Sequence, residues 1–133
     1  VLDYHHIQGL NHTHRTKIHV GSYQDIVDAD VVIVSASAAS TPDMKDRTLL
    51  TKANSVIVND VFRQLSAVTK EAIVILISNP VDAITYLAHQ AGYPSDKVIG
   101  TGTILESARF RTFIADHYNV ETKAVAGFVS VEH

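Results

Sequence analysis

The sequence predicts an α/β fold, in which helices cover a parallel sheet. Two runs of apolar, mostly β-branched residues, 31–34 and 72–77, are too short for helices and are typical of strands buried on both faces. Helical patterns alternate with these runs along the chain, which favours right-handed connections between parallel strands. The composition agrees, because 46% of the 133 residues are hydrophobic and 19% are charged, as in globular proteins.

The remaining elements follow from local patterns. Apolar residues recur at helical spacing from Arg47 to about Thr69, with Asp46 as a candidate cap. A helix after the central strand is expected to end at Gly92. The other expected elements are a strand at 17–21, a helical turn at 25–30, a strand at 97–102, a helix at 104–118 and a closing strand at 123–131.

Charge and composition argue against several classes of function. The net charge is −3 without a basic block, so nothing points to nucleic acid or to an anionic membrane. The absence of Cys excludes disulfide scaffolds and thiolate metal sites and is compatible with the cytosol. No apolar run approaches the roughly 20 residues of a membrane span. The chain opens on Val1 and stops directly after an apolar stretch, so we expect a segment of a longer protein.

A cluster of histidines near the start raises the possibility of a metal site. No pair in it has the i,i+4 spacing of helical zinc ligands, and no Glu or Cys completes a ligand set. A polar loop before a strand is the favoured interpretation, and we expect no metal. The cluster consists of His5, His6, His12, His14 and His19.

Polar residues follow the central strand at Ser78-Asn79-Pro80. Ligands bind at the carboxyl ends of strands in open α/β sheets, and the amide of Asn79 can both donate and accept hydrogen bonds. Asn-Pro is also an ordinary turn signal, so a ligand site and a simple turn remain equally open.

Two positively charged regions are candidates for binding an acid. Glu106 and Arg109 lie three residues apart on a predicted helix, where they are either a solvated ion pair or part of a site. Apolar neighbours suggest that Arg109 or Arg111 points inward, where a guanidinium can hold a carboxylate. Arg47, at a junction between loop and helix, is either a lid residue or an exposed cation.

The last residue and a glycine turn are less decisive. His133, after Glu132, is a candidate general acid or base, or else plain surface. Gly100-Thr101-Gly102 is weak as a phosphate loop, because Leu105 stands where a dinucleotide fingerprint has its third Gly.

These motifs, in this order, resemble the L-lactate, L-malate and L-2-hydroxyisocaproate dehydrogenase family. The resemblance covers nearly the whole chain, and Asn-Pro-Val-Asp followed by the Gly-Thr-Gly-Thr…Ala-Arg run is its most specific part. The matching runs are 28–33, 46–47, Lys52 with Asn54, 78–82, 98–111 and 132–133.

The resemblance implies a Rossmann-type sheet with flanking helices, incomplete here, that runs into the start of an α+β catalytic domain. Residues 1–101 would belong to the NAD-binding domain, without its first βαβ unit, and residues 102–133 would open the catalytic domain. The implied reaction is hydride transfer between NAD and an L-2-hydroxy acid. The full-length form would be a cytoplasmic homo-oligomer, a dimer or tetramer, acting on a small 2-oxo or 2-hydroxy acid.

The resemblance also implies a role for each site residue. His133 would donate the proton to the 2-oxo group, and Arg109 would clamp the substrate carboxylate. Arg47 would polarise the carbonyl, and Asn79 would touch substrate and nicotinamide from a loop whose X-Pro bond is cis in relatives. Residues along the cofactor would be Ser35, Ala36, Ser37, Asn54, Ser78 and Asn79.

Four positions bear on substrate and activity. Ser40 stands where malate dehydrogenases carry an Arg that pairs with a second carboxylate, so a monocarboxylic 2-oxo acid of the lactate or hydroxyisocaproate type is expected. Glu106 replaces the Asp that orients the catalytic His, and Ser37 and Val131 replace Gly. These departures keep open a non-catalytic relative that serves as a structural or binding module. The 133 residues alone are expected to be inactive.

Overall fold

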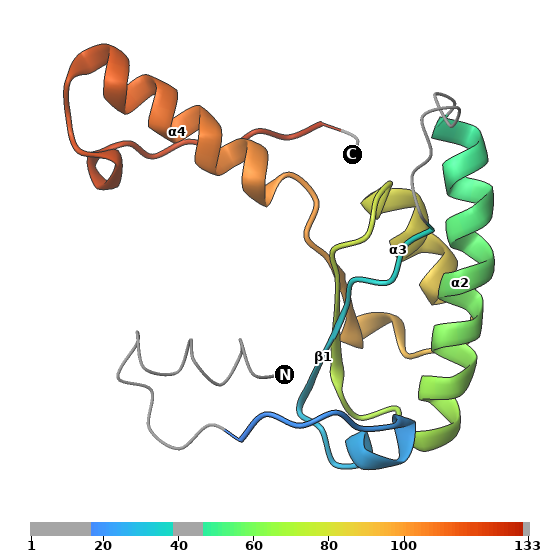
Figure 1. The fold of residues 1–133 in the computed structure, drawn as a ribbon. Coiled ribbons are helices and arrows are strands. Elements are labelled where there is room, and N and C mark those ends of the chain that lie inside the picture. The colour runs from blue at the N-terminus through green and yellow to red at the C-terminus, as the bar shows by residue number, and fades with distance from the viewer. Residues whose placement is uncertain (1–16, 39–46, 132–133) are drawn as a thin grey trace.

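Three parallel strands form the sheet in the computed structural model, which describes residues 17–38 and 47–131. Strand β1 spans Val31–Val34, β2 spans Ile73–Leu76 and β3 spans Val98–Gly100. Their order is β1-β2-β3, with β2 pairing in parallel to both neighbours (Figure 1). This confirms the predicted parallel α/β architecture and the positions of its three main strands.

Three long helices accompany the sheet in the described part of the chain. Helix α2 spans Arg47–Val68, α3 spans Val81–Gln90 and α4 spans Ile104–Tyr118, close to the predicted bounds. Figure 1 shows α2 and α3 on one side of the sheet, whereas α4 extends away from it with the final segment running back alongside. Short 3₁₀ helices lie at η2 (Tyr23–Ile26), η3 (Ser95–Lys97) and η4 (Thr122–Ala124).

The core lies between the sheet and helices α2 and α3. The side chains of Phe62 and Leu65 from α2, Val74 and Leu76 from β2 and Ile84 from α3 are fully buried there. Gly92 follows the end of α3 with φ +86, a left-handed conformation that favours glycine after a helix. The predicted C-terminal glycine is thus confirmed.

The prediction that the strands are buried on both faces is wrong for the described structure. Burial alternates along β2, where Val74 and Leu76 are fully buried but Ile73 is 43% exposed. Ile33 and Ile99 are also more than half exposed. The reason is that α2 and α3 pack on the same side, so residues of opposite parity along each strand face away from both helices.

Two of the predicted strands, 17–21 and 123–131, are not strands either. Residues 17–22 have no regular structure, and the helical turn expected at 25–30 is the 3₁₀ helix η2. The final segment lies against α4 instead of pairing with a strand: the Ser107 hydroxyl accepts a hydrogen bond from the Val129 N–H (3.0 Å), and Thr103 donates to the Val129 carbonyl. Thr103, at the N-cap of α4, and Ser107, on α4, therefore take the place of a neighbouring strand.

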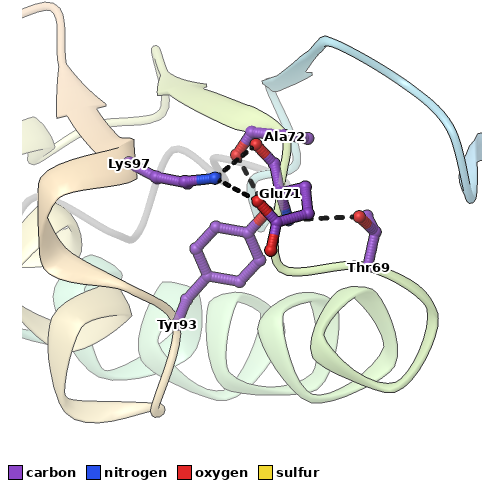
Figure 2. Close-up of polar contacts among 5 residues, drawn as sticks. All are labelled: Thr69, Glu71, Ala72, Tyr93 and Lys97. Atoms are coloured by element: carbon purple, nitrogen blue, oxygen red, sulfur yellow. Dashed lines mark hydrogen bonds and ion pairs between the residues drawn. The ribbon is translucent and has the colours of Figure 1, made fainter.

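A polar cluster holds the beginning of β2 to the loop before β3. Figure 2 shows the Tyr93 hydroxyl donating to the carbonyl oxygen of Ala72 (2.9 Å). The Lys97 ammonium donates to the carbonyl oxygen of Glu71 (2.9 Å) and to its carboxylate (2.7 Å). This cluster lies at the amino ends of the strands and leaves their carboxyl ends for the candidate site.

Candidate active site

The segments that follow β1 and β2 lie side by side and extend the sheet by further hydrogen bonds. The Ile77 N–H donates to the carbonyl oxygen of Val34 (3.1 Å), and the buried Ser78 hydroxyl donates to that of Ala36 (2.6 Å). The Thr101 N–H, after β3, donates to the carbonyl oxygen of Leu76 (3.0 Å). All three strand ends are therefore held at one edge, as the parallel topology requires.

Asn54, on α2, connects two of these segments. Its side chain is fully buried. The amide oxygen accepts a hydrogen bond from the Ala38 N–H (2.6 Å), and the amide nitrogen donates to the carbonyl oxygen of Asn79 (2.6 Å) and to the Ser37 hydroxyl (3.2 Å). One side chain thus joins the segment after β1 to the segment after β2.

Asn79 precedes Pro80 through a cis peptide bond, in agreement with the resemblance. Pro80 caps α3, which begins at Val81. The backbone carbonyl of Asn79 faces Asn54, while the residue as a whole is exposed and lines a cavity. Of the two interpretations of Ser78-Asn79-Pro80, the turn is confirmed, and this turn places Asn79 at the cavity.

The cavity lies between the strand ends and the first turns of α4 and has a volume of about 530 Å³, within the range of small-molecule sites. It brings together three predicted site residues, Asn79, Glu106 and Arg109. Its other walls are mainly apolar. They are Ile77, Val81, Thr101, Gly102, Ile104, Leu105 and Ala108.

Glu106 and Arg109 are neighbours, as their spacing on α4 predicts. The guanidinium of Arg109 lies 3.9 Å from the Glu106 carboxylate, and the Arg109 side chain is 63% exposed. Arg111 is the arginine that packs inward: it donates to the carbonyl oxygen of Gly127 (3.0 Å) and lies over the Phe128 ring. Since Arg111 is engaged with the final segment, Arg109 is the guanidinium at the cavity.

The structure describes only some of the remaining predicted site residues. Ser35 and Ser37 are exposed at the end of β1, and Ala36 between them is half-buried. Arg47 is the first residue of α2, two turns before Asn54, but its side chain is outside the described structure. Ser40 and His133 lie outside the described residues.

Sequence reasoning missed most of the cavity's apolar walls and Thr101. The position of Thr101 directly after β3 was the available signal, because all strands of a parallel sheet end at the same edge. Ile104 and Leu105, both more than half exposed, signalled that the first turn of α4 does not enter the core.

Within 17–38 and 47–131, no helix is long and apolar enough to cross a membrane. In the same ranges, no group of three or more His, Cys, Asp or Glu residues is arranged to hold a metal ion.

Comparison with known families decides the affiliation of the chain. Residues 1–100 match the family model described as lactate/malate dehydrogenase, NAD binding domain. The chain belongs to the lactate/malate dehydrogenase family. NAD is the cofactor of the domain that this family model describes, as the resemblance implied.

Relatives from this family include both kinds of dehydrogenase. L-lactate dehydrogenase 2 of Clostridium acetobutylicum is 37% identical over 99% of the chain and 42% of its own length. Malate dehydrogenase of Bacillus pumilus is 42% identical over 84% of the chain and 36% of its own length. The chain therefore spans about two fifths of the length of these relatives.

A solved structure supports the fold. The lactate dehydrogenase of Cryptosporidium parvum, complexed with lactic acid and nicotinamide adenine dinucleotide, superposes with a TM-score of 0.84 and 35% identity. The match covers 96% of the chain and 40% of that structure. The parallel sheet with flanking helices is thus the Rossmann-type arrangement of lactate and malate dehydrogenases.

The residues at the edge fit a dinucleotide. Small residues follow β1, so positions 35–38 carry no bulky side chain at this strand end. Two of them, Ser35 and Ser37, expose hydroxyl groups that can bond polar atoms of a ligand. The cavity beside Asn79 adjoins this edge.

Proposed function

We propose that the protein is an NAD-dependent oxidoreductase that interconverts a monocarboxylic 2-oxo acid and the corresponding L-2-hydroxy acid. The observation that carries this proposal is the cavity at the strand ends, in which Asn79, Glu106 and Arg109 face the same space. Residues 1–101 form part of the cofactor domain in this proposal, and residues 102–133 form the start of the catalytic domain.

Each residue has a role that its chemistry supports. The Arg109 guanidinium binds the substrate carboxylate with two parallel hydrogen bonds. The Asn79 amide orients the 2-oxo group and the nicotinamide. His133 donates the proton to the 2-oxo oxygen, and Glu106 holds the imidazole in place. Arg47 stabilises the negative charge that develops on that oxygen.

NAD supplies the hydride when it is bound. The small residues after β1 and the Asn79 side chain after β2 provide the surface for it. The proposed cofactor surface consists of Ser35, Ala36, Ser37, Ser78 and Asn79, together with Asn54, whose buried side chain supports it from behind.

Substrate preference rests on Ser40 and on the cavity walls. Ser40 has no charge to pair with a second carboxylate, and Ile77, Ile104 and Leu105 offer an exposed aliphatic surface. Both features favour lactate-type or hydroxyisocaproate-type substrates over malate. The working form is proposed to be a cytoplasmic homo-oligomer.

A non-catalytic role is the second candidate, and one contact favours it. Glu106 is one methylene longer than the Asp it replaces, and its carboxylate lies 3.9 Å from Arg109. In that position it competes with the substrate for the guanidinium. A relative with this competition would keep the sheet as a structural or binding module.

Turnover distinguishes the two candidates. NADH oxidation is measured with pyruvate, 2-oxoisocaproate and oxaloacetate, using the full natural polypeptide that contains these residues. We expect one of the two monocarboxylic acids to be preferred. Arg109→Ala should lower kcat/KM by about 100-fold or more, because it removes a charge-assisted pair of hydrogen bonds.

Arg63→Ala is the matched control, since Arg63 is an exposed arginine of α2 paired with Asp60, and it should leave kcat/KM unchanged. If a folded protein that binds NADH oxidises none of it with any of the three acids, this would support the non-catalytic role. Preference for oxaloacetate would refute the assignment based on Ser40.

A further inference from the structure

We infer that Asn54 is a positioning residue, which sets the distance between the two strand-end segments and thereby presents Asn79 to the cavity. This inference rests on the proposed function, because it concerns the same site. It adds a residue that acts through the backbone of others, and it assigns the buried side chain a task distinct from direct contact with a ligand.

Burial and hydrogen bonding carry the first step. The Asn54 side chain is 0% exposed, and its partners are Ser37, Ala38 and Asn79, none of which is ionisable. Both amide hydrogens and the amide oxygen are engaged with protein atoms. A buried polar group that is fully paired fixes its partners in place, since losing a bond would leave a polar atom unsatisfied.

The second step is that the two bonds require opposite chemistry. The segment after β1 offers an N–H, from Ala38, and the segment after β2 offers a carbonyl oxygen, from Asn79. An amide is both acceptor and donor, whereas a carboxylate of the same shape is acceptor only and an alkyl group is neither. Asn54 can therefore hold both segments, but an ionised Asp or a Leu at this position cannot.

The third step connects these hydrogen bonds of Asn54 to the candidate active site. The carbonyl of Asn79 is held by Asn54, and Asn79 lines the cavity together with Arg109. Ser78, the preceding residue, makes the only other side-chain bond that the described structure shows between these two segments, to Ala36. If the hydrogen bond from Asn54 is lost, Asn79 is free to shift. Displacement of an active-site residue by about 1 Å can lower the rate roughly 100-fold.

Asn54→Asp tests the hydrogen bonds of residue 54 with almost no change in side-chain volume. We expect kcat/KM for the preferred 2-oxo acid to fall by about 10- to 100-fold at pH 8, where the new carboxylate cannot donate to Asn79. When the pH is lowered, the buried carboxyl group becomes protonated and regains a donor. The ratio of the variant's kcat/KM to that of the natural protein should therefore rise between pH 8 and pH 5.5.

Asn59→Asp is the matched control, because Asn59 is an exposed asparagine on the same helix. It should leave kcat/KM within twofold of the natural protein at every pH. Asn54→Asp that folds and also stays within twofold would overturn the inference, as would a loss that does not recover at low pH.

A second variant covers the case in which Asn54→Asp does not fold. Ser78→Ala removes the other bond between the two segments, to Ala36, and should lower kcat/KM by a smaller factor, about 3- to 10-fold. No change in Ser78→Ala would refute the idea that this spacing matters. If the natural protein itself turns over none of the acids, the proposed function fails. The hydrogen bonds of Asn54 can then still be tested by hydrogen exchange, because Asn54→Leu should speed the exchange of the Ala38 amide.

Discussion

At the scale of single residues, the cluster of Glu71, Tyr93 and Lys97 shows how charge and burial act together. Burial of Tyr93 is the main cause that raises the pKa of its phenol above the ordinary value, so the hydroxyl remains a donor to Ala72. The hydrogen bond from Lys97 lowers the pKa of Glu71, and the same bond raises the pKa of Lys97. Glu71 and Lys97 thus stabilise each other in their charged forms.

Glu71→Gln should lower Tm slightly at pH 7, because Lys97 loses its charged partner. A carboxyl group whose pKa is lowered by folding stabilises the protein above its unfolded pKa, ordinarily 4.5, and this contribution is lost as the pH falls through the folded pKa. The Tm difference between the natural protein and Glu71→Gln should therefore be constant above about pH 5 and shrink as the pH falls below the unfolded pKa. Calorimetry across this range checks it; a difference that is unchanged at pH 3 would contradict the charge-based explanation.

At the scale of elements, the contact between α3 and β3 depends on a glycine. A Cβ at Gly100 would lie 2.3 Å from the Thr85 hydroxyl and 3.4 Å from the Val81 side chain. The Thr85 hydroxyl donates to the Val81 carbonyl one turn earlier in α3 (2.6 Å), so it cannot move without losing that bond. The end of β3 therefore approaches α3 closely because residue 100 has no side chain.

Gly100→Ala should destabilise the protein by about 1–3 kcal/mol, the usual cost of an overpacked contact. Adding Thr85→Ala removes the closest atom and should restore more than half of that loss, giving a favourable coupling energy. Urea unfolding of the natural polypeptide, the two single variants and the double variant measures it. Strictly additive effects would show that the clash with Thr85 is not the cause.

At the scale of the whole molecule, one face of the sheet is exposed among the described residues. It is the face opposite α2 and α3. Val31, Ile33, Ile73, Ile77 and Ile99 are all more than two fifths exposed, and they project from the side of the sheet opposite α2 and α3. Adjacent exposed residues of this kind form an apolar patch, which favours association. The strand edge of β1 that does not face β2 adds to this tendency.

We predict that the 133-residue polypeptide by itself self-associates and has no turnover. Ile33→Lys combined with Ile99→Lys should shift it towards the monomer in sedimentation velocity, without lowering Tm, because both side chains are at least half exposed. Val56→Lys is the control, since Val56 is at least as exposed as either isoleucine but lies on α2. A monodisperse 14.5 kDa species before any substitution would disprove the self-association, and NADH oxidation by it would disprove the inactivity.

The sequence by itself determined the type and order of the main elements and the most specific motifs. The short β-branched runs, the helical spacing after Arg47 and the spacing of Glu106 and Arg109 are local patterns, and local patterns depend only on neighbouring residues. The prediction of strands at 17–21 and 123–131 was wrong because a strand needs a neighbouring strand to pair with. Alternation of apolar residues along the sequence does not supply that neighbour.

Only the tertiary structure decided which residues meet. Burial on one face followed from where α2 and α3 pack, and the choice between Arg109 and Arg111 followed from the course of the final segment along α4. The position of Asn54 between Ala38 and Asn79 joins residues 16 and 25 positions apart. Contacts over such separations are made by the folded chain as a whole, so no local pattern encodes them.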